Sequence, residues 1–235
     1  KKELRRKREF PHIKKSVGRY FKSIDKDLCD FEIKWHESGK PCVVINSTDK
    51  IDISMSLTHE GSLLLCSVGN VTQAIDLQTV SKKSISDWRA LLGDSKYDKI
   101  RNFEDKNLDY AATALWSVNE VIIKADKKID ESLLLEKYED KKYYLFRLGN
   151  VRVLSCVIRF SRGFDRLFSF LLGEQDLLSD HEVNEKLGYG DKYFDFHADY
   201  SKVEKQLVTV NKFPVTFKNN KLKSRRVYFT SYFDW

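Results

Sequence analysis

Residues 108–124 read LDYAATALWSVNEVIIK, and this stretch decides the fold because it carries the strongest helical pattern in the chain. Apolar residues recur at intervals of three and four, which predicts an amphipathic helix that runs to about residue 127. Asn107 or Asp109 is a suitable N-cap for this helix. We expect its core-facing stripe to consist of Leu108, Ala112, Leu115, Trp116 and Ile123.

Strands are predicted on both sides of this helix. Short apolar or alternating stretches lie before it at 31–35, 42–46, 51–57, 63–68 and 73–77, and after it at 151–160 and 166–172. Residues 161–165 include Gly163 and are typical of a hairpin loop between the last two strands. Two more helices are expected over 3–21 and 84–103. Strands, then helices, then strands again indicate an α+β fold.

The composition indicates a folded protein with a real core. Of the 235 residues, 41% are hydrophobic, and 15 Phe, 11 Tyr and 4 Trp are too many for a disordered polyelectrolyte. The apolar runs are too short to cross a bilayer, and no signal peptide opens the chain. No paired spacing joins the four cysteines, which favours reduced thiols and a cytoplasmic location. They are Cys29, Cys42, Cys66 and Cys156.

The net charge of +7 is concentrated at the two ends of the sequence. Residues 1–22 hold ten basic and two acidic residues, a balance of +8, and residues 211–235 hold six and one, a balance of +5. This pattern predicts a polyanionic partner, although a solvated terminal helix explains it equally well. No nucleic-acid motif accompanies the basic residues, so nucleic acid is the weaker candidate and we expect no such partner.

Acidic, amide and basic side chains recur on two predicted elements near the middle of the chain. Asp76 is expected to end a strand, with Gln78 following it, and Glu120 and Lys124 lie one turn apart on the helix described above. If the helix packs across the strand, the carboxylates of Asp76 and Glu120 converge. Two carboxylates, one amide and water make an oxygen site suited to Mg²⁺ bound to substrate phosphates.

Each of these residues also has an ordinary structural explanation. Glu120 and Lys124 stand in the favourable order for an ion pair on a helix surface. Asp76 at the end of a strand is often only a cap. His59, in the expected turn at 58–61, is one more phosphate-binding candidate, but a lone histidine usually has a structural role.

Taken together, the order and spacing over roughly residues 5–173 resemble the 4'-phosphopantetheinyl transferases of the larger, surfactin-synthetase-activating type. That family has a Gly-Lys-Pro turn, a strand ending in Ser-His-Ser, a Gly-Ile-Asp-Ile-Glu strand, and a helix with Trp-x-x-Lys-Glu-Ala and a later Lys. The matching positions here are Gly39-Lys40-Pro41, Thr58-His59-Glu60, residues 74–78 and residues 116–124.

The resemblance implies two similar α+β halves related by a pseudo-twofold axis, with coenzyme A bound in the cleft between them. It implies transfer of the phosphopantetheine arm from coenzyme A to a serine of an acyl carrier protein or carrier domain. By matched position, Asp76, Gln78 and Glu120 would hold Mg²⁺, and Glu120 would also be the base for the serine hydroxyl. Lys124 would stabilise charge on the phosphates.

The resemblance also assigns residues to the nucleotide end of coenzyme A. Thr58 and His59 would hold the 3'-phosphate, and Lys40 would lie near the nucleotide. The chain departs from the family pattern at five positions, which are Gln78 for the second acid, Asn119 for a lysine, Thr58 and Glu60 for two serines, and Ala74 for a glycine.

The implied domains are an N-terminal half at 1–125, a C-terminal half with its closing hairpin at 126–175, and an extension at 176–235. Residues 227–235 resemble the start of a hotdog-fold acyl thioesterase, which points to a following hotdog-like domain in a polyketide- or fatty-acid-type synthase. An ordinary amphipathic strand is the alternative interpretation of this tail.

Three functions therefore compete. The first is the Mg²⁺-dependent transferase, and the second is a non-catalytic relative that binds coenzyme A or a carrier domain. The third, a nucleic-acid binder that uses the basic ends, predicts a steep dependence of binding on salt concentration.

Overall fold

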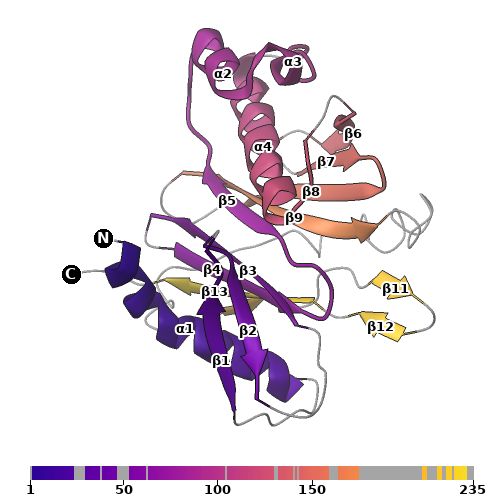
Figure 1. The fold of residues 1–235 in the computed structure, drawn as a ribbon. Helices are drawn as coiled ribbons and strands as arrows, with labels where there is room; N and C mark the ends of the chain where they lie inside the picture. Colours follow the sequence, from indigo (N-terminus) through magenta and orange to yellow (C-terminus); the bar gives the residue numbers. More distant parts are fainter. Residues whose placement is uncertain are drawn as a thin grey trace. The chain divides into compact units, whose positions relative to one another are not determined.

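The fold is that of a computed structural model. It describes residues 2–23, 30–37, 39–46, 53–61, 63–103, 105–129, 132–139, 141, 143–158, 164–174, 208–210, 216–218, 221–223 and 225–231. The chain forms two compact units (Figure 1). The first unit comprises residues 1–73 and 205–235, and the second comprises residues 74–204.

The first unit is built on a four-stranded antiparallel sheet with the strand order β10-β13-β4-β3. Its strands are β3 (Ser54–Glu60), β4 (Leu63–Gly69), β10 (Val208–Val210) and β13 (Arg225–Ser231). Two hairpins accompany it, β1 (Phe31–Trp35) with β2 (Pro41–Ile45), and β11 (Thr216–Lys218) with β12 (Lys221–Lys223). Because β13 pairs with β4 along its whole length, the end of the chain completes a sheet begun by its start.

The helix α1 (Lys2–Ser23) packs on this sheet. Its side chains at intervals of three and four enter one apolar core with residues of β1, β3 and β4. The predicted helix over 3–21 is thus confirmed. The buried members of this core are Ile13, Val17, Tyr20, Phe21, Ile33, Met55, Leu64, Cys66 and Val68.

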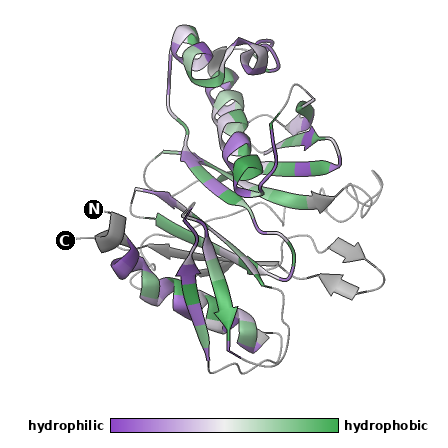
Figure 2. Cartoon of the chain, viewed as in Figure 1, coloured by the Kyte–Doolittle hydropathy of each residue, from purple (hydrophilic) through white to green (hydrophobic). Residues whose placement is uncertain are grey.

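The second unit is a five-stranded antiparallel sheet covered by the long helix α4 (Asp105–Lys124). The strand order is β5-β9-β8-β7-β6, and α4 packs against β5, β7, β8 and β9. Figure 1 shows α4 lying along this sheet. Strands β8 and β9 are largely green in the hydropathy view of Figure 2. The strands are β5 (Ile75–Thr79), β6 (Leu134–Glu139), β7 (Tyr143–Leu148), β8 (Val151–Ile158) and β9 (Arg166–Glu174).

Alternate residues of these strands face α4, and this partition decides which polar groups the helix meets. Val153 and Val157 of β8, and Leu167 and Leu171 of β9, share one core with α4. By the same alternation, the residues between them on each strand, Ser155 and Ser169, also face the helix. The sheet is therefore apolar under α4 except along one line of small polar side chains.

The prediction of one continuous helix over 84–103 is wrong, because Gly93 interrupts it. Helix α2 (Ile85–Leu92) begins at a capping box formed by Ser84 and Asp87, and α3 (Asp94–Tyr97) follows as a single turn. Gly93 has φ of +80°, a conformation that residues with a Cβ rarely adopt. Its amide donates to the carbonyl of Arg89 and closes α2.

The predicted core stripe of α4 is partly wrong. Leu108, Ala112 and Leu115 are buried, but Ile123 is 56% exposed. The true stripe is rotated around the helix axis, and Ile122 takes the inward position that the prediction gave to Ile123. The remaining fully buried members of this face are Ala111, Ala114, Val118 and Val121.

Other sequence predictions are close to the structure or shifted along the chain. The predicted strands at 151–160 and 166–172 are observed as the antiparallel pair β8 and β9, and their loop at 159–163 lies outside the described residues. The predicted turn at 58–61 is wrong for its first three residues, because β3 continues to Glu60 and the turn begins at Gly61. Asp76 does not end a strand but is the second residue of β5.

The two units divide the chain at other places than the predicted 125 and 175. The predicted boundary at 125 falls inside the second unit, because α4 packs on strands that come both before and after it in the sequence. Residues 225–231 of the predicted extension pair with β4 in the first unit. Residues 175–207 lie outside the described part of the chain.

Three of the cysteines are described, and each is a free thiol. Burial raises the pKa of Cys66 to about 12, and burial also raises the pKa of Cys156. Both thiols therefore stay neutral at physiological pH. Within the described residues, no helix is both long and apolar enough to cross a membrane.

Candidate active site

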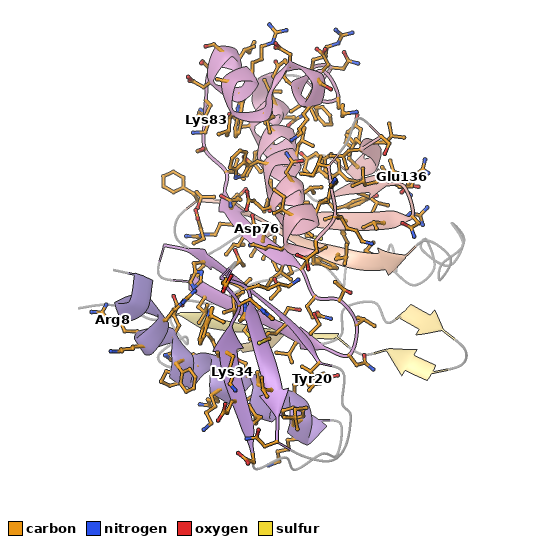
Figure 3. The ribbon with its side chains drawn as sticks, viewed as in Figure 1. Arg8, Tyr20, Lys34, Asp76, Lys83 and Glu136 are labelled. Carbon is orange, nitrogen blue, oxygen red and sulfur yellow. The ribbon has the colours of Figure 1, made fainter. Side chains whose placement is uncertain are left out.

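The centre of the candidate site is the carboxylate of Asp76, on the edge strand β5 (Figure 3). Ile75 and Leu77 point away from it and are fully buried, so the pleat of the strand holds Asp76 on the side where α4 lies. Asp76 itself is almost completely buried. A buried carboxylate is stable only when it is paired and hydrogen-bonded, so its partners define the site.

Lys124, the last residue of α4, forms an ion pair with Asp76. Its Nζ lies 2.9 Å from Asp76 Oδ1 and donates a second hydrogen bond of 2.9 Å to the carbonyl oxygen of Ile75. The Asp76 side chain is 4% exposed and that of Lys124 is 28% exposed. The helix and the strand that carried the sequence pattern are therefore joined by a largely buried ion pair.

Two neutral donors hold the other oxygen of the same carboxylate. Ser117 Oγ donates to Asp76 Oδ2 at 3.0 Å, and Gln78 Nε2 donates to it at 2.9 Å. Gln78 occupies the position where the family has an acid, and here it acts as a donor toward Asp76. The Asp76 carboxylate thus accepts hydrogen bonds from one cation and two neutral groups.

Glu120 borders this cluster on the same face of α4. It follows Ser117 by three residues and precedes Lys124 by four, so it projects within about 60° of both and lies between them along the helix axis. Its side chain is half-buried, and within the described residues its carboxylate forms no hydrogen bond or ion pair. The surface ion pair between Glu120 and Lys124, one of our alternatives, is therefore wrong.

A line of serines continues the site across the sheet, and our sequence analysis did not predict it. Asp76 pairs in register with Ser169 of β9, which pairs with Ser155 of β8. Ser169 Oγ donates to Ser155 Oγ at 2.8 Å, and both residues are fully buried. Ser117, also fully buried, is the counterpart on the helix. The feature of the sequence that could have predicted this line is the occurrence of serines at inward positions of otherwise apolar strands.

The donor set near Asp76 has the chemistry of a magnesium site. Asp76, Glu120 and the amide oxygen of Gln78 are all hard oxygen donors, and Mg²⁺ usually takes one or two carboxylates plus water and phosphate. The carboxylate of Glu120, which no other described residue contacts by a hydrogen bond or ion pair, is available to a cation, whereas Oδ1 of Asp76 is in contact with Lys124. Within the described residues, no cluster of three or more His, Cys, Asp or Glu side chains is arranged to hold a metal.

The nucleotide-binding candidates belong to the first unit. His59 Nε2 lies 2.7 Å from Glu9 Oε1 of α1, with side-chain exposures of 24% and 3%, so this histidine already has an anionic partner. Thr58 is buried on β3. Lys40 is half-exposed in the turn between β1 and β2, where its carbonyl accepts a hydrogen bond from the amide of His36.

The structure thus brings Asp76, Gln78 and Lys124 into contact, and among the described residues Glu120 has no hydrogen-bond or ion-pair partner. It gives Lys40, Thr58 and His59 to the other unit. No protein-family model and no curated protein sequence matches this chain.

Proposed function

We propose that the chain transfers the 4'-phosphopantetheine arm of coenzyme A to a serine of an acyl carrier protein or carrier domain. The contact between Lys124 and Asp76 is the observation that carries this proposal. It joins the helix and the strand that hold the motif, and it leaves the neighbouring Glu120 free to act. A mobile cation and a free carboxylate beside one buried acid suit chemistry on a phosphate ester.

The general α+β architecture is compatible with the proposal. Each unit consists of an antiparallel sheet with a long helix packed on it, α1 in the first and α4 in the second. The proposal retains Lys40, Thr58 and His59 of the first unit as contacts of the nucleotide.

The exposed face of α1 supports an acidic protein as the partner. Most of the exposed residues whose burial is described are basic, and Glu9 of the same helix is buried. Complementary charge raises the rate at which two proteins meet and orients their encounter. The exposed basic residues of α1 are Lys7, Arg8, Lys14, Lys15 and Lys22.

In this reaction the side chains have separate tasks. Glu120 accepts the proton of the serine hydroxyl, directly or through water, as the serine oxygen bonds to the phosphorus of the arm. The bond from that phosphorus to the bridging oxygen breaks, and adenosine 3',5'-bisphosphate leaves with the electron pair. Lys124 stabilises the charge that develops on the phosphates. Bound Mg²⁺ would neutralise phosphate charge, and Asp76, Gln78 and Glu120 are the residues that would hold it.

The test is mass spectrometry of an apo acyl carrier protein incubated with the purified chain, coenzyme A and Mg²⁺. We expect the mass of the carrier to rise by one phosphopantetheine arm. Glu120→Gln should slow transfer at least about 100-fold, because it removes the base. Asp98→Asn is the matched control, since Asp98 is a half-exposed acid in a surface ion pair with Arg101. Equal rates for Glu120→Gln and the parent chain would refute the assignment of the base.

A second candidate function has one observation in its favour. Asp76 is already satisfied by three protein donors, and Gln78 replaces an acid, so the cluster is also stable without chemistry. A non-catalytic domain that binds coenzyme A or a carrier domain would retain such a cluster. It predicts that coenzyme A raises the melting temperature while no carrier gains mass.

A further inference from the structure

The ammonium group of Lys124 contacts Asp76 Oδ1, the oxygen that we expect a bound cation to contact as well. This group lies 2.9 Å from Oδ1, the oxygen opposite the one that Ser117 and Gln78 hold. The two neutral donors fix the orientation of the carboxylate, and the ammonium supplies the charge that its burial demands. A divalent cation and Lys124 therefore seek the same oxygen.

The charges of this cluster disfavour binding of a divalent cation while the ammonium group of Lys124 is in place. Asp76 and Glu120 carry two negative charges and Lys124 carries one positive charge, so the cluster has a net charge of −1 while Lys124 is in place. A divalent cation beside the ammonium would add like-charge repulsion in a poorly solvated site. If the ammonium moves away, the cation instead meets two uncompensated carboxylates.

The side chain of Lys124 is less constrained than that of Asp76. Lys124 is the last residue of α4, its side chain is 28% exposed, and its flexible stem ends in a group that bonds equally well to water or phosphate. Asp76 is 4% exposed and is held by donors from both β5 and α4. The exchange breaks the two hydrogen bonds that Lys124 donates, to Asp76 Oδ1 and to the carbonyl oxygen of Ile75.

We infer that Lys124 and a divalent cation exchange at Asp76. In the ligand-free chain Lys124 competes with the cation for Asp76 and weakens its binding, and the phosphates of an incoming nucleotide draw Lys124 away as the cation takes its place. This inference rests on the proposed function, because it assumes a phosphate substrate. Lys124 is then the group that makes cation binding depend on the substrate.

The first experiment measures the binding of Mn²⁺, as a paramagnetic substitute for Mg²⁺, to the purified full chain by electron paramagnetic resonance. Lys124→Gln keeps a hydrogen-bond donor but removes the charge, and it should bind Mn²⁺ about tenfold more tightly than the parent or better. Lys124→Arg keeps the charge and should stay within about twofold. Lys127→Gln, at an exposed lysine three residues away, is the matched control and should also stay within about twofold.

The second experiment needs no variant. The parent chain is labelled with acetic anhydride with and without saturating Mn²⁺, and labelled peptides are quantified by mass spectrometry. Mn²⁺ should raise the labelling of Lys124 severalfold and leave that of Lys127 unchanged, because the exchange frees one ammonium and not the other.

The outcomes separate this inference from the proposed function. Unchanged Mn²⁺ affinity in Lys124→Gln, or unchanged labelling of Lys124, overturns the exchange even if transfer to the carrier is observed. No detectable Mn²⁺ binding by the parent chain and by Lys124→Gln also overturns it. Tighter binding by Lys124→Gln without any transfer supports the exchange and refutes the transferase.

Discussion

The second unit contains two ion pairs that differ in which partner is buried. They are Asp76 with Lys124 and Glu136 with Arg152. In the first, the acid is buried at 4% exposure and the base is the more accessible partner at 28%. In the second, the base Arg152 is buried at 4% and the acid Glu136 is at 26%. In the first pair the base is therefore the partner that solvent reaches, and in the second it is the acid.

The geometry of the second pair fixes it in place. Arg152 donates from Nε and Nη2 to the two oxygens of Glu136, at 3.0 and 2.8 Å. Such a two-pronged contact is rigid, whereas a single lysine ammonium on a flexible stem leaves easily. Glu136 lies at the irregularity between Leu135 and Lys137, where β6 bulges against β7. We regard the Glu136 pair as structural and the Asp76 pair as functional.

The largest expected effect is on the structural pair. Glu136→Ala leaves the guanidinium of Arg152 buried without its carboxylate, and breaking a buried pair in this way costs about 3–5 kcal/mol of unfolding free energy. Urea denaturation measures this loss, and added Mn²⁺ should not reverse it. A loss below about 1 kcal/mol would mean that this pair contributes no more than a surface contact.

The functional pair should be weaker and recoverable. Lys124→Ala leaves Asp76 with Ser117 and Gln78 as donors, so we expect a smaller loss of about 1–3 kcal/mol. Saturating Mn²⁺ should restore most of this loss, because a cation replaces the missing ammonium. If Mn²⁺ stabilises Lys124→Ala no more than the parent chain, the contrast between the two pairs disappears.

The dependence of the unfolding free energy on pH reports on the buried thiol of Cys66. Burial holds the pKa of Cys66 at about 12 against an ordinary 9.0, so the folded chain keeps a proton that the unfolded chain loses above pH 9. Stability should therefore fall by up to about 1.4 kcal/mol per pH unit for this thiol as pH rises above about 9. Cys66→Ala should flatten the decline measured by urea denaturation between pH 8.5 and 10. The raised pKa of Cys156 would retain part of it.

The smallest effect concerns a buried polar atom of α4. Asn119 Oδ1 is buried, and it has no hydrogen-bond partner among the described residues. Asn119→Leu removes this unsatisfied group and should raise the unfolding free energy by about 1 kcal/mol. Thermal unfolding measures the gain. A loss of stability would show that this amide has a role that the described contacts do not explain.

The sequence predicted the parts of the site that depend on spacing within one element or on adjacent elements. The i, i+4 spacing of Glu120 and Lys124 placed both on one face of α4, and the amphipathic pattern of α4 required a sheet for it to cover. The sequence predicted that Asp76 and Glu120 converge if the helix packs across the strand, and the contact that the structure shows is between Asp76 and Lys124. The donor role of Gln78 did not follow, because the direction of an amide side chain depends on its neighbours in space.

Long-range pairing was beyond the sequence argument. Nothing local in residues 225–231 indicates that they pair with β4, because strand partners distant in sequence are chosen by the whole sheet. The register that aligns Asp76 with Ser169 and Ser155 arises in the same way. Glycine is a residue type that often interrupts helices, but the apolar pattern on both sides of Gly93 favoured one continuous helix.

The most direct test of the account is a crystal structure of the chain with coenzyme A and Mn²⁺, with the metal located by its anomalous scattering. The account predicts one peak within bonding distance of Asp76 Oδ1 and Glu120, with Lys124 turned from Asp76 to a phosphate oxygen. A peak elsewhere, or Lys124 still bonded to Asp76 in the complex, would contradict it.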